Sequence, residues 1–141
     1  MKLLLAVDGS RFSDAATEAV IAQYQPHGTE VVVLNVVDLH LPIPTSDGAG
    51  FRELSLKHGR ELVQQTERML SKAGYKTQTV VKEGDPKSRI IDEATRWKTD
   101  LIVMGSHGRK GFERFLMGSV ADSVSRHASC SVQIVRIPGA L

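Results

Sequence analysis

Five apolar runs divide this chain of 141 residues, and four segments with helical spacing separate them. This alternation constrains the fold more than any other feature of the sequence. The runs cover residues 2–7, 31–37, 76–82, 100–105 and 131–137. Continuous apolar runs bounded by turn residues are typical of strands that are covered on both faces, as in a parallel sheet. Residues 76–82 alternate between polar and apolar side chains, which predicts a half-exposed strand.

The four intervening segments carry the start and stop signals of helices. We expect these helices to begin at Ser10 or Ser13, at about residue 51, at Asp85–Pro86 and near Gly118–Ser119. Asp85 is a good N-cap residue, and a proline suits the first helical position that follows it. Gly74 is well suited to follow the second helix, at about 51–73. The order of elements predicts a doubly wound, Rossmann-like α/β fold with five parallel strands, four helices and right-handed crossovers.

Composition sets limits on the class of protein. A chain with 41% hydrophobic and 24% charged residues fits one globular domain, which we expect to span residues 1–141. Lys and Arg number 18 against 16 Asp and Glu, and no run concentrates the charge, so nothing predicts nucleic-acid binding. Asp8 interrupts the first apolar run too early for a signal peptide, and no run is long enough to predict a membrane span. Cys130 is the only cysteine, which favours a reducing, cytoplasmic location.

The segment after the fourth apolar run is rich in glycine. Gly105, Gly108 and Gly111 follow the run, and Gly118 precedes the fourth helix. In a doubly wound sheet, ligands bind beyond the carboxyl ends of the strands, where this segment lies. Glycines let backbone N–H groups approach an anion, and a helix N-terminus adds unpaired N–H groups. We therefore expect the amides of Gly108, Gly118 and Ser119 to converge on a phosphate.

The same segment also fits a simpler interpretation, a flexible loop followed by a capping serine. Its basic residues Arg109, Lys110 and Arg114 favour the phosphate hypothesis. No P-loop pattern, no dinucleotide fingerprint after the first strand and no nucleophile elbow is present.

Several single residues leave alternatives open. His107 could act as a base or phosphate donor, or be an ordinary loop histidine. Asp8 and Asp38 could share a magnesium ion, but the simpler interpretation of Asp38 is a carboxylate in the turn after a strand. Cys130 has no identified basic partner, which favours a buried small residue over a nucleophile. The long connection at 38–50 is either a functional flap or a surface insertion.

Together these blocks resemble the universal stress protein family, specifically its ATP-binding branch with the motif G-x2-G-x9-G-[ST]. Gly105, Gly108, Gly118 and Ser119 match that spacing without a gap. The resemblance covers nearly the whole chain, through LLAVDGS, VVVLNVVD, EGDPKSRIIDEA and the final block from Asp100 to Arg136. It implies an adenine nucleotide alpha hydrolase-like fold. Some members have Pro-Thr where this chain has Ala6-Val7.

The resemblance also implies which positions contact a bound ATP or AMP. Ala6, Val7 and Asp8 would meet the adenosine, Val36 or Val37 would present backbone groups to the adenine edge, and Met104 and Gly105 would flank the nucleoside. Gly108, Gly118, Ser119 and Val120 would hold the phosphates, which would carry any Mg²⁺. Family members commonly form homodimers through the last strand, here 131–137, and an apolar edge strand benefits from such pairing.

These observations predict a cytoplasmic, adenine-nucleotide-binding stress-response sensor or regulator that acts on an unknown protein partner. Rapid phosphoryl transfer needs a positioned base as well as charge stabilisation, and no convincing base is present. The enzyme question therefore stays open, with a stable binder favoured. The alternatives are a slow ATP hydrolase or phosphotransferase that uses the same pocket, and an interaction module with an empty pocket.

Overall fold

The computed structural model describes residues 1–39, 48–109 and 117–138. Its five strands form one parallel sheet in the order β3-β2-β1-β4-β5. The strands are β1 (Lys2–Ala6), β2 (Glu30–Val37), β3 (Lys76–Glu83), β4 (Leu101–Gly105) and β5 (Ser131–Val135). The helices are α1 (Arg11–Gln23), α2 (Gly48–Lys72), α3 (Pro86–Arg96) and α4 (Ser119–His127). The predicted doubly wound α/β fold is confirmed.

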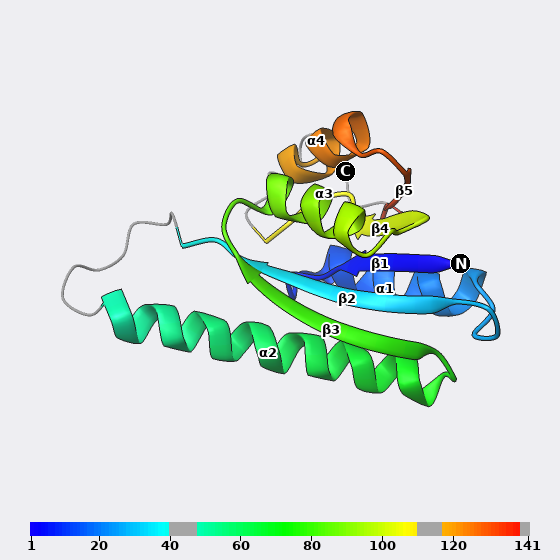
Figure 1. The fold of residues 1–141 in the computed structure, drawn as a ribbon, viewed down its shortest axis with the longest axis horizontal. Coiled ribbons are helices and arrows are strands. Elements are labelled where there is room, and N and C mark those ends of the chain that lie inside the picture. Colours follow the sequence, from blue (N-terminus) through cyan, green and yellow to red (C-terminus); the bar gives the residue numbers. More distant parts are fainter. Residues whose placement is uncertain (40–47, 110–116, 139–141) are drawn as a thin grey trace.

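Two helices cover each face of the sheet (Figure 1). On one face, Leu3 and Leu5 of β1 pack with Val20 of α1 and Val63 of α2. On the other face, Leu4 packs in a cluster to which α3 and α4 contribute. Consecutive leucines thus pack against helices on opposite faces of the sheet, because side chains alternate along a strand. This explains why the central runs are almost continuously apolar.

The helix ends follow the predicted signals closely. The Ser10 side chain accepts a hydrogen bond from the Ser13 amide at 3.2 Å, which identifies Ser10 as the cap of α1. Asp85 caps α3 in the same way, with Pro86 as the first helical residue. Helix α2 begins at Gly48, three residues before the predicted start at about residue 51. The connection after β2 is therefore shorter than predicted, and residues 40–47 lie outside the described residues.

The chain order places the switch point of the sheet between β1 and β4. The connections after β1 and β2 build the sheet in one direction, and the chain then crosses to β4 and β5 on the other side. The loops that follow β1 and β4 flank this point, and in doubly wound sheets ligands bind there, beyond the carboxyl ends of the strands. Among the described helices, none combines the length and apolarity that crossing a membrane requires.

Candidate functional site

The side chain of Asp8 joins the two loops at the switch point. Its Oδ1 accepts a hydrogen bond from the Ser10 amide at 2.9 Å, and its Oδ2 accepts one from the Arg109 amide at 3.0 Å. A Cβ on Gly108 would lie 3.0 Å from the same Oδ2, so this glycine lets the second loop approach the carboxylate. Asp8 therefore holds the glycine-rich segment against the loop after β1.

Gly105 allows α1 to pack directly on the end of β4. A Cβ there would lie 2.7 Å from the backbone carbon and oxygen of Phe12, and 2.7 Å from its Cβ. A side chain cannot be accommodated at that distance without moving the helix. The first glycine of the motif thus has a packing role, on which the position of α1 relative to β4 depends.

The position of Gly118 contradicts part of the prediction that three amides converge on a phosphate. Its N–H donates to the carbonyl oxygen of Ser106 at 2.7 Å, so this amide is already paired. Its φ of −69° and ψ of 160° are accessible to any residue, and the need for glycine is steric. A Cβ would lie 3.1 Å from His107 Cα and 3.2 Å from the Ser106 oxygen. Gly118 shapes the site and does not contribute its amide.

Ser119 and Val120, which the sequence also predicts as phosphate contacts, form the first turn of α4. The first N–H groups of a helix have no partner within it, and Gly118 provides no side-chain cap. Ser119 is exposed and Val120 is half-buried. The helix dipole adds about half a positive charge at this end. Unpaired amides at a helix N-terminus are well suited to an anion.

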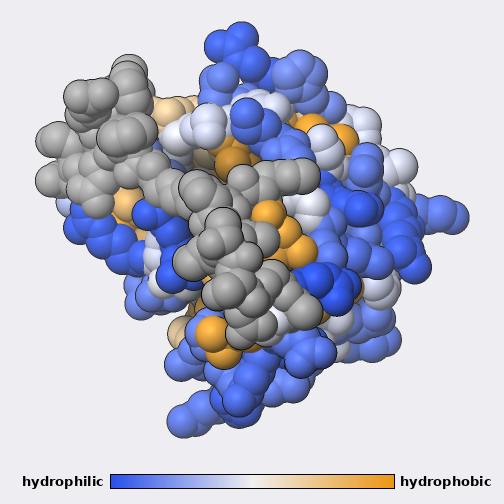
Figure 2. Space-filling model, turned by 90° about the vertical axis from the view of Figure 1, so that its left-hand side faces the viewer, coloured by the Kyte–Doolittle hydropathy of each residue, from blue (hydrophilic) through white to orange (hydrophobic). Residues whose placement is uncertain are grey.

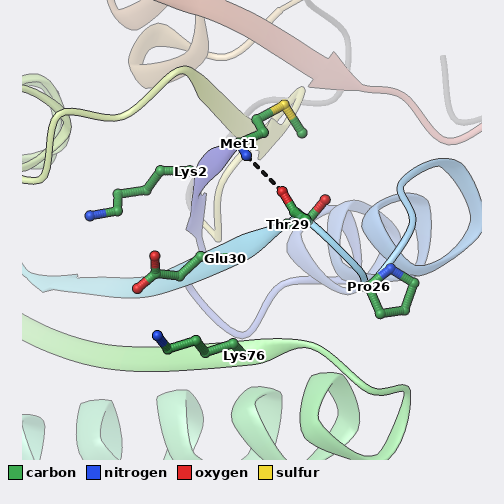
Figure 3. Close-up of a pocket in the computed structure, with 7 residues that line it drawn as sticks. Met1, Lys2, Pro26, Thr29, Glu30 and Lys76 are labelled. Carbon is green, nitrogen blue, oxygen red and sulfur yellow. Dashed lines mark hydrogen bonds between the residues drawn. The ribbon is translucent and has the colours of Figure 1, made fainter.

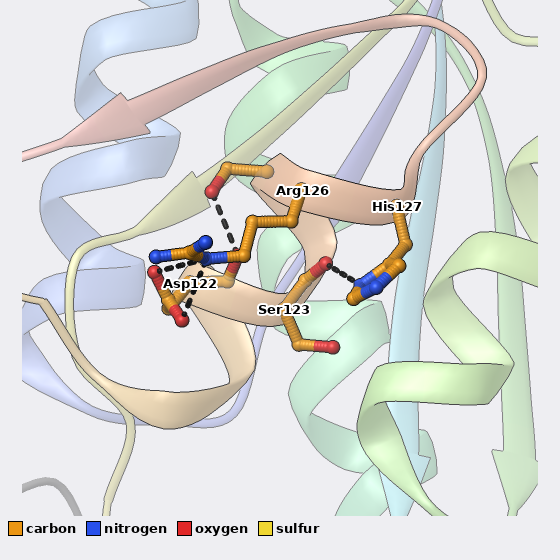
Figure 4. A network of polar contacts seen from close by, with 5 residues as sticks. Asp122, Ser123, Arg126 and His127 are labelled. Atoms are coloured by element: carbon orange, nitrogen blue, oxygen red, sulfur yellow. Dashed lines mark hydrogen bonds and ion pairs between the residues drawn. The ribbon is translucent and has the colours of Figure 1, made fainter.

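A carboxylate in the same first turn would weaken that positive potential. Arg126, one turn further on, donates to both oxygens of Asp122 at 3.1 and 3.2 Å (Figure 4). His127 Nδ1 lies 2.9 Å from the Ser123 carbonyl oxygen and does not face the start of the helix. This exposed ion pair offsets part of the charge of Asp122.

His107 is turned into the protein. It is 5% exposed, its Nδ1 lies 2.9 Å from Ser106 Oγ, and its ring centroid lies 4.9 Å from that of Phe12. This arrangement supports a structural role and not the general-base role that the sequence left open. Phe12 and Ser106 were not predicted as site residues, although both fix the loop.

The backbone near the ends of β1 and β2 is only partly available. The Val7 amide donates to Leu34 at 2.9 Å, and the Val7 carbonyl accepts from the Asn35 side chain at 2.8 Å. The Val37 carbonyl accepts from Gly84 at 3.0 Å, on the β3 side. Because backbone groups alternate in direction along a strand, those of Val36 face the β1 side. Asn35 was not predicted as a site residue, although its place as a lone polar residue in an apolar run could have identified it.

The remaining predicted residues differ in burial, and some lie outside the described residues. Met104 is buried at the end of β4, and Ala6 is half-buried in the cluster that contains α3 and α4. Burial raises the pKa of the Cys130 thiol above its usual value, which disfavours the reactive thiolate. Lys110, Gly111 and Arg114 lie outside the described residues. Figure 2 looks onto the carboxyl end of the sheet, where hydrophobic side chains adjoin the grey segments within a hydrophilic rim.

A separate cavity lies at the opposite, amino end of the strands. It measures about 420 Å³, and Lys2, Thr29, Glu30 and Lys76 are among its lining residues (Figure 3). The amino group of Met1 donates there to the Gly28 carbonyl at 2.6 Å. This cavity is remote from the switch point and contains none of the predicted site residues.

The fold and the loops joined by Asp8 define a doubly wound α/β domain with its candidate site at the switch point. A model of the universal stress protein family matches residues 1–136, and the chain belongs to that family. A universal stress protein of Methanocaldococcus jannaschii is 35% identical over 141 residues, which cover 97% of this chain and 82% of that protein.

Solved structures share the fold. Universal stress protein UspA from Lactobacillus plantarum is 27% identical with a TM-score of 0.84, and the match covers 96% of this chain and 97% of that one. A family protein from Arabidopsis thaliana with AMP bound is 20% identical, with a TM-score of 0.71 and coverage of 99% and 93%. A universal stress protein in complex with cAMP is also 20% identical, with a TM-score of 0.71 and coverage of 96% of both chains.

Proposed function

We propose that this chain binds an adenine nucleotide, ATP or AMP, in the crevice between the loops that follow β1 and β4. The observation that carries the proposal is the first turn of α4, where the amides of Ser119 and Val120 lack intrahelical partners. Gly108 and Gly118 let the chain pack closely on Asp8, Ser106 and His107, and this close packing positions that turn. Family membership and the relatives that hold AMP and cAMP support an adenylate over other phosphates.

In this arrangement the phosphates contact Ser119 and Val120, and Gly108 lines their approach. The nucleoside lies over the ends of β1 and β4, beside Ala6, Val7, Met104 and Gly105. Val36 is a better candidate than Val37 for the adenine edge, because the Val37 carbonyl is paired with Gly84. Mg²⁺ would be carried by the phosphates, since backbone amides already occupy both oxygens of Asp8.

The proposal is one of binding and not of rapid turnover. His107 is buried against Phe12, and Asp8 is engaged by two backbone amides, so neither is presented as a general base. A nucleotide that orders the glycine-rich segment can regulate a partner protein if the two loop states bind that partner differently. We place this regulator in the cytoplasm.

We also propose a homodimer formed through β5. This strand is an edge of the sheet, and Val132, Ile134 and Val135 on it are only half-buried. Pairing with a second copy would cover them and satisfy the open backbone edge. Sedimentation equilibrium tests this point independently of nucleotide.

Calorimetry with adenosine, AMP and Mg·ATP tests the proposed function. The phosphate contacts predict that AMP binds at least about tenfold more tightly than adenosine, because a hydrogen bond to a charged group contributes about 1.5–3 kcal/mol. Guanosine monophosphate serves as the control for base recognition. Equal affinities for adenosine and AMP would rule out the phosphate contacts, and no binding of any adenylate would rule out the function.

A further inference from the structure

Strand β3 presents an open edge that the proposed function does not use. It ends the sheet opposite β5, and each of its eight residues is exposed or half-buried. The Gly84 amide donates to Val37 of β2, so the alternation of backbone groups directs those of Thr77, Thr79 and Val81 away from β2. Residues 77–81 contain neither proline nor charged residues, which are the features that commonly protect an edge strand from pairing with another chain.

A groove runs between this edge and α2, which lies alongside β3 in Figure 1. It contains an open cavity of about 360 Å³. We call it the β3–α2 groove, and it is lined by Leu56, Arg60, Val63, Gln64, Thr79 and Val81. Leu56 and Val81 are half-buried and offer apolar surface there, and the open amides lie next to it. An added strand could therefore use both backbone and side-chain contacts.

Arg60 gives the groove its charge. It is the only charged residue among the six that line the cavity, and no carboxylate of the described residues pairs with it. Further along the same edge, Arg52 pairs with Glu83, and Glu67 lies 3.4 Å from the Thr77 hydroxyl. A ligand that places a carboxylate beside Arg60 would complement it.

We infer that the β3–α2 groove docks an extended segment of a partner protein, which adds to β3 as a strand and places an acidic side chain against Arg60 between two apolar ones. A second copy of this chain is a poorer occupant. Twofold pairing centred on Thr79 would add residues 77–81 of the second copy as the strand, and these contain no acidic side chain to complement Arg60. This binding surface is distinct from the nucleotide crevice and from β5.

A pair of peptides with the same composition provides the probe. In fluorescein-labelled Ser-Val-Thr-Glu-Thr-Val-Ser, the valines and the glutamate share one face of an extended strand. In Ser-Thr-Val-Glu-Val-Thr-Ser, the valines lie on the face opposite the glutamate. Fluorescence anisotropy should show binding of the first peptide and at least about threefold weaker binding of the second. A third peptide with lysine in place of glutamate should also bind about threefold to fivefold more weakly than the first.

Variants of α2 test the role of Arg60. Arg60→Glu should reverse the preference, so that the lysine peptide becomes the tighter ligand. Arg68→Glu is the matched control, since Arg68 is an exposed arginine of the same helix that does not line the cavity. It should keep the wild-type preference. Circular dichroism confirms that both variants are folded.

Amide hydrogen exchange shows whether the peptide adds as a strand. Saturating peptide should slow exchange at Thr79 and Val81, whose amides face away from β2. The inference is overturned by undetectable binding at millimolar peptide, by equal binding of the two isomeric peptides, or by binding without protection of these amides. Protection that rises with protein concentration in the absence of peptide also overturns it, because a second copy would then be the occupant.

Discussion

Replacing Ser119 with proline should remove one proposed phosphate contact without disturbing α4. Ser119 is the first residue of the helix, where proline is well accepted because its missing N–H has no intrahelical partner. Gly118, which would precede the proline, has φ −69° and ψ 160°, the extended conformation that a following proline requires. The change therefore deletes an amide donor at a position that already has the right backbone.

The expected loss follows from the chemistry of that amide. A hydrogen bond to a charged group contributes about 1.5–3 kcal/mol, so a loss of about 2 kcal/mol weakens AMP binding by about 30-fold. Binding should not vanish, because the Val120 amide and the helix dipole remain. Ser119→Ala is the matched control, since it removes the hydroxyl and keeps the N–H.

Calorimetry with AMP measures the effect, and thermal unfolding without ligand verifies that both variants are folded. The comparison of proline with alanine isolates the amide from the hydroxyl. If the two variants bind AMP equally well while melting like the wild type, the first turn of α4 is not the phosphate site. The reasoning from unpaired amides would then be wrong.

Three further predictions concern stability and can be measured by urea unfolding. Gly105→Ala should destabilise the fold by about 1–3 kcal/mol, because the new methyl group meets the Phe12 backbone at 2.7 Å; unchanged stability would show that α1 shifts freely. Thr99→Val should be neutral or stabilising by up to about 1 kcal/mol, because the buried Thr99 hydroxyl has no partner among the described residues; a clear loss would reveal a missed partner. Burial raises the pKa of Tyr75 above 10.0, so as pH rises the unfolded chain loses this proton before the folded chain does. The stabilisation linked to the protonated Tyr75 hydroxyl is therefore complete below pH 10 and is lost as pH rises through the folded-state pKa. Tyr75→Phe should cost about 1 kcal/mol at neutral pH, through the lost bond to Val20, and should flatten the stability curve above pH 10.

Much of the fold follows from local signals in the sequence. Asp85 and Pro86 set the start of α3 through a cap and a fixed φ, which are properties of the residues themselves. The apolar runs locate the strands because both faces of the sheet are covered. The start of α2 was less predictable, since Gly48 and Gly50 have low helix propensity and yet lie inside the helix. Helix propensity is a weak local preference that the rest of the structure can override.

The candidate site was harder to predict, because the direction of an amide depends on dihedral angles that composition does not specify. The sequence predicts that the Gly118 amide faces a phosphate, and it gave no sign that this N–H would pair with Ser106. The contact between Gly105 and Phe12 joins two segments far apart in the chain. A long-range contact of this kind leaves no periodic signal.

The glycines of the motif are therefore needed for a shared physical reason, close packing of the protein on itself. Their spacing suggests a different reason, direct contact of their amides with a phosphate. Gly105 admits the backbone of α1, Gly108 admits the carboxylate of Asp8, and Gly118 lies against Ser106 and His107. In each case a Cβ would contact the protein itself at 3.1 Å or less. The motif specifies how closely segments approach, and this approach positions the start of α4 at the switch point. The proposed donors are the next residues, Ser119 and Val120, which need no special side chain because any residue at a helix N-terminus other than proline offers the same N–H.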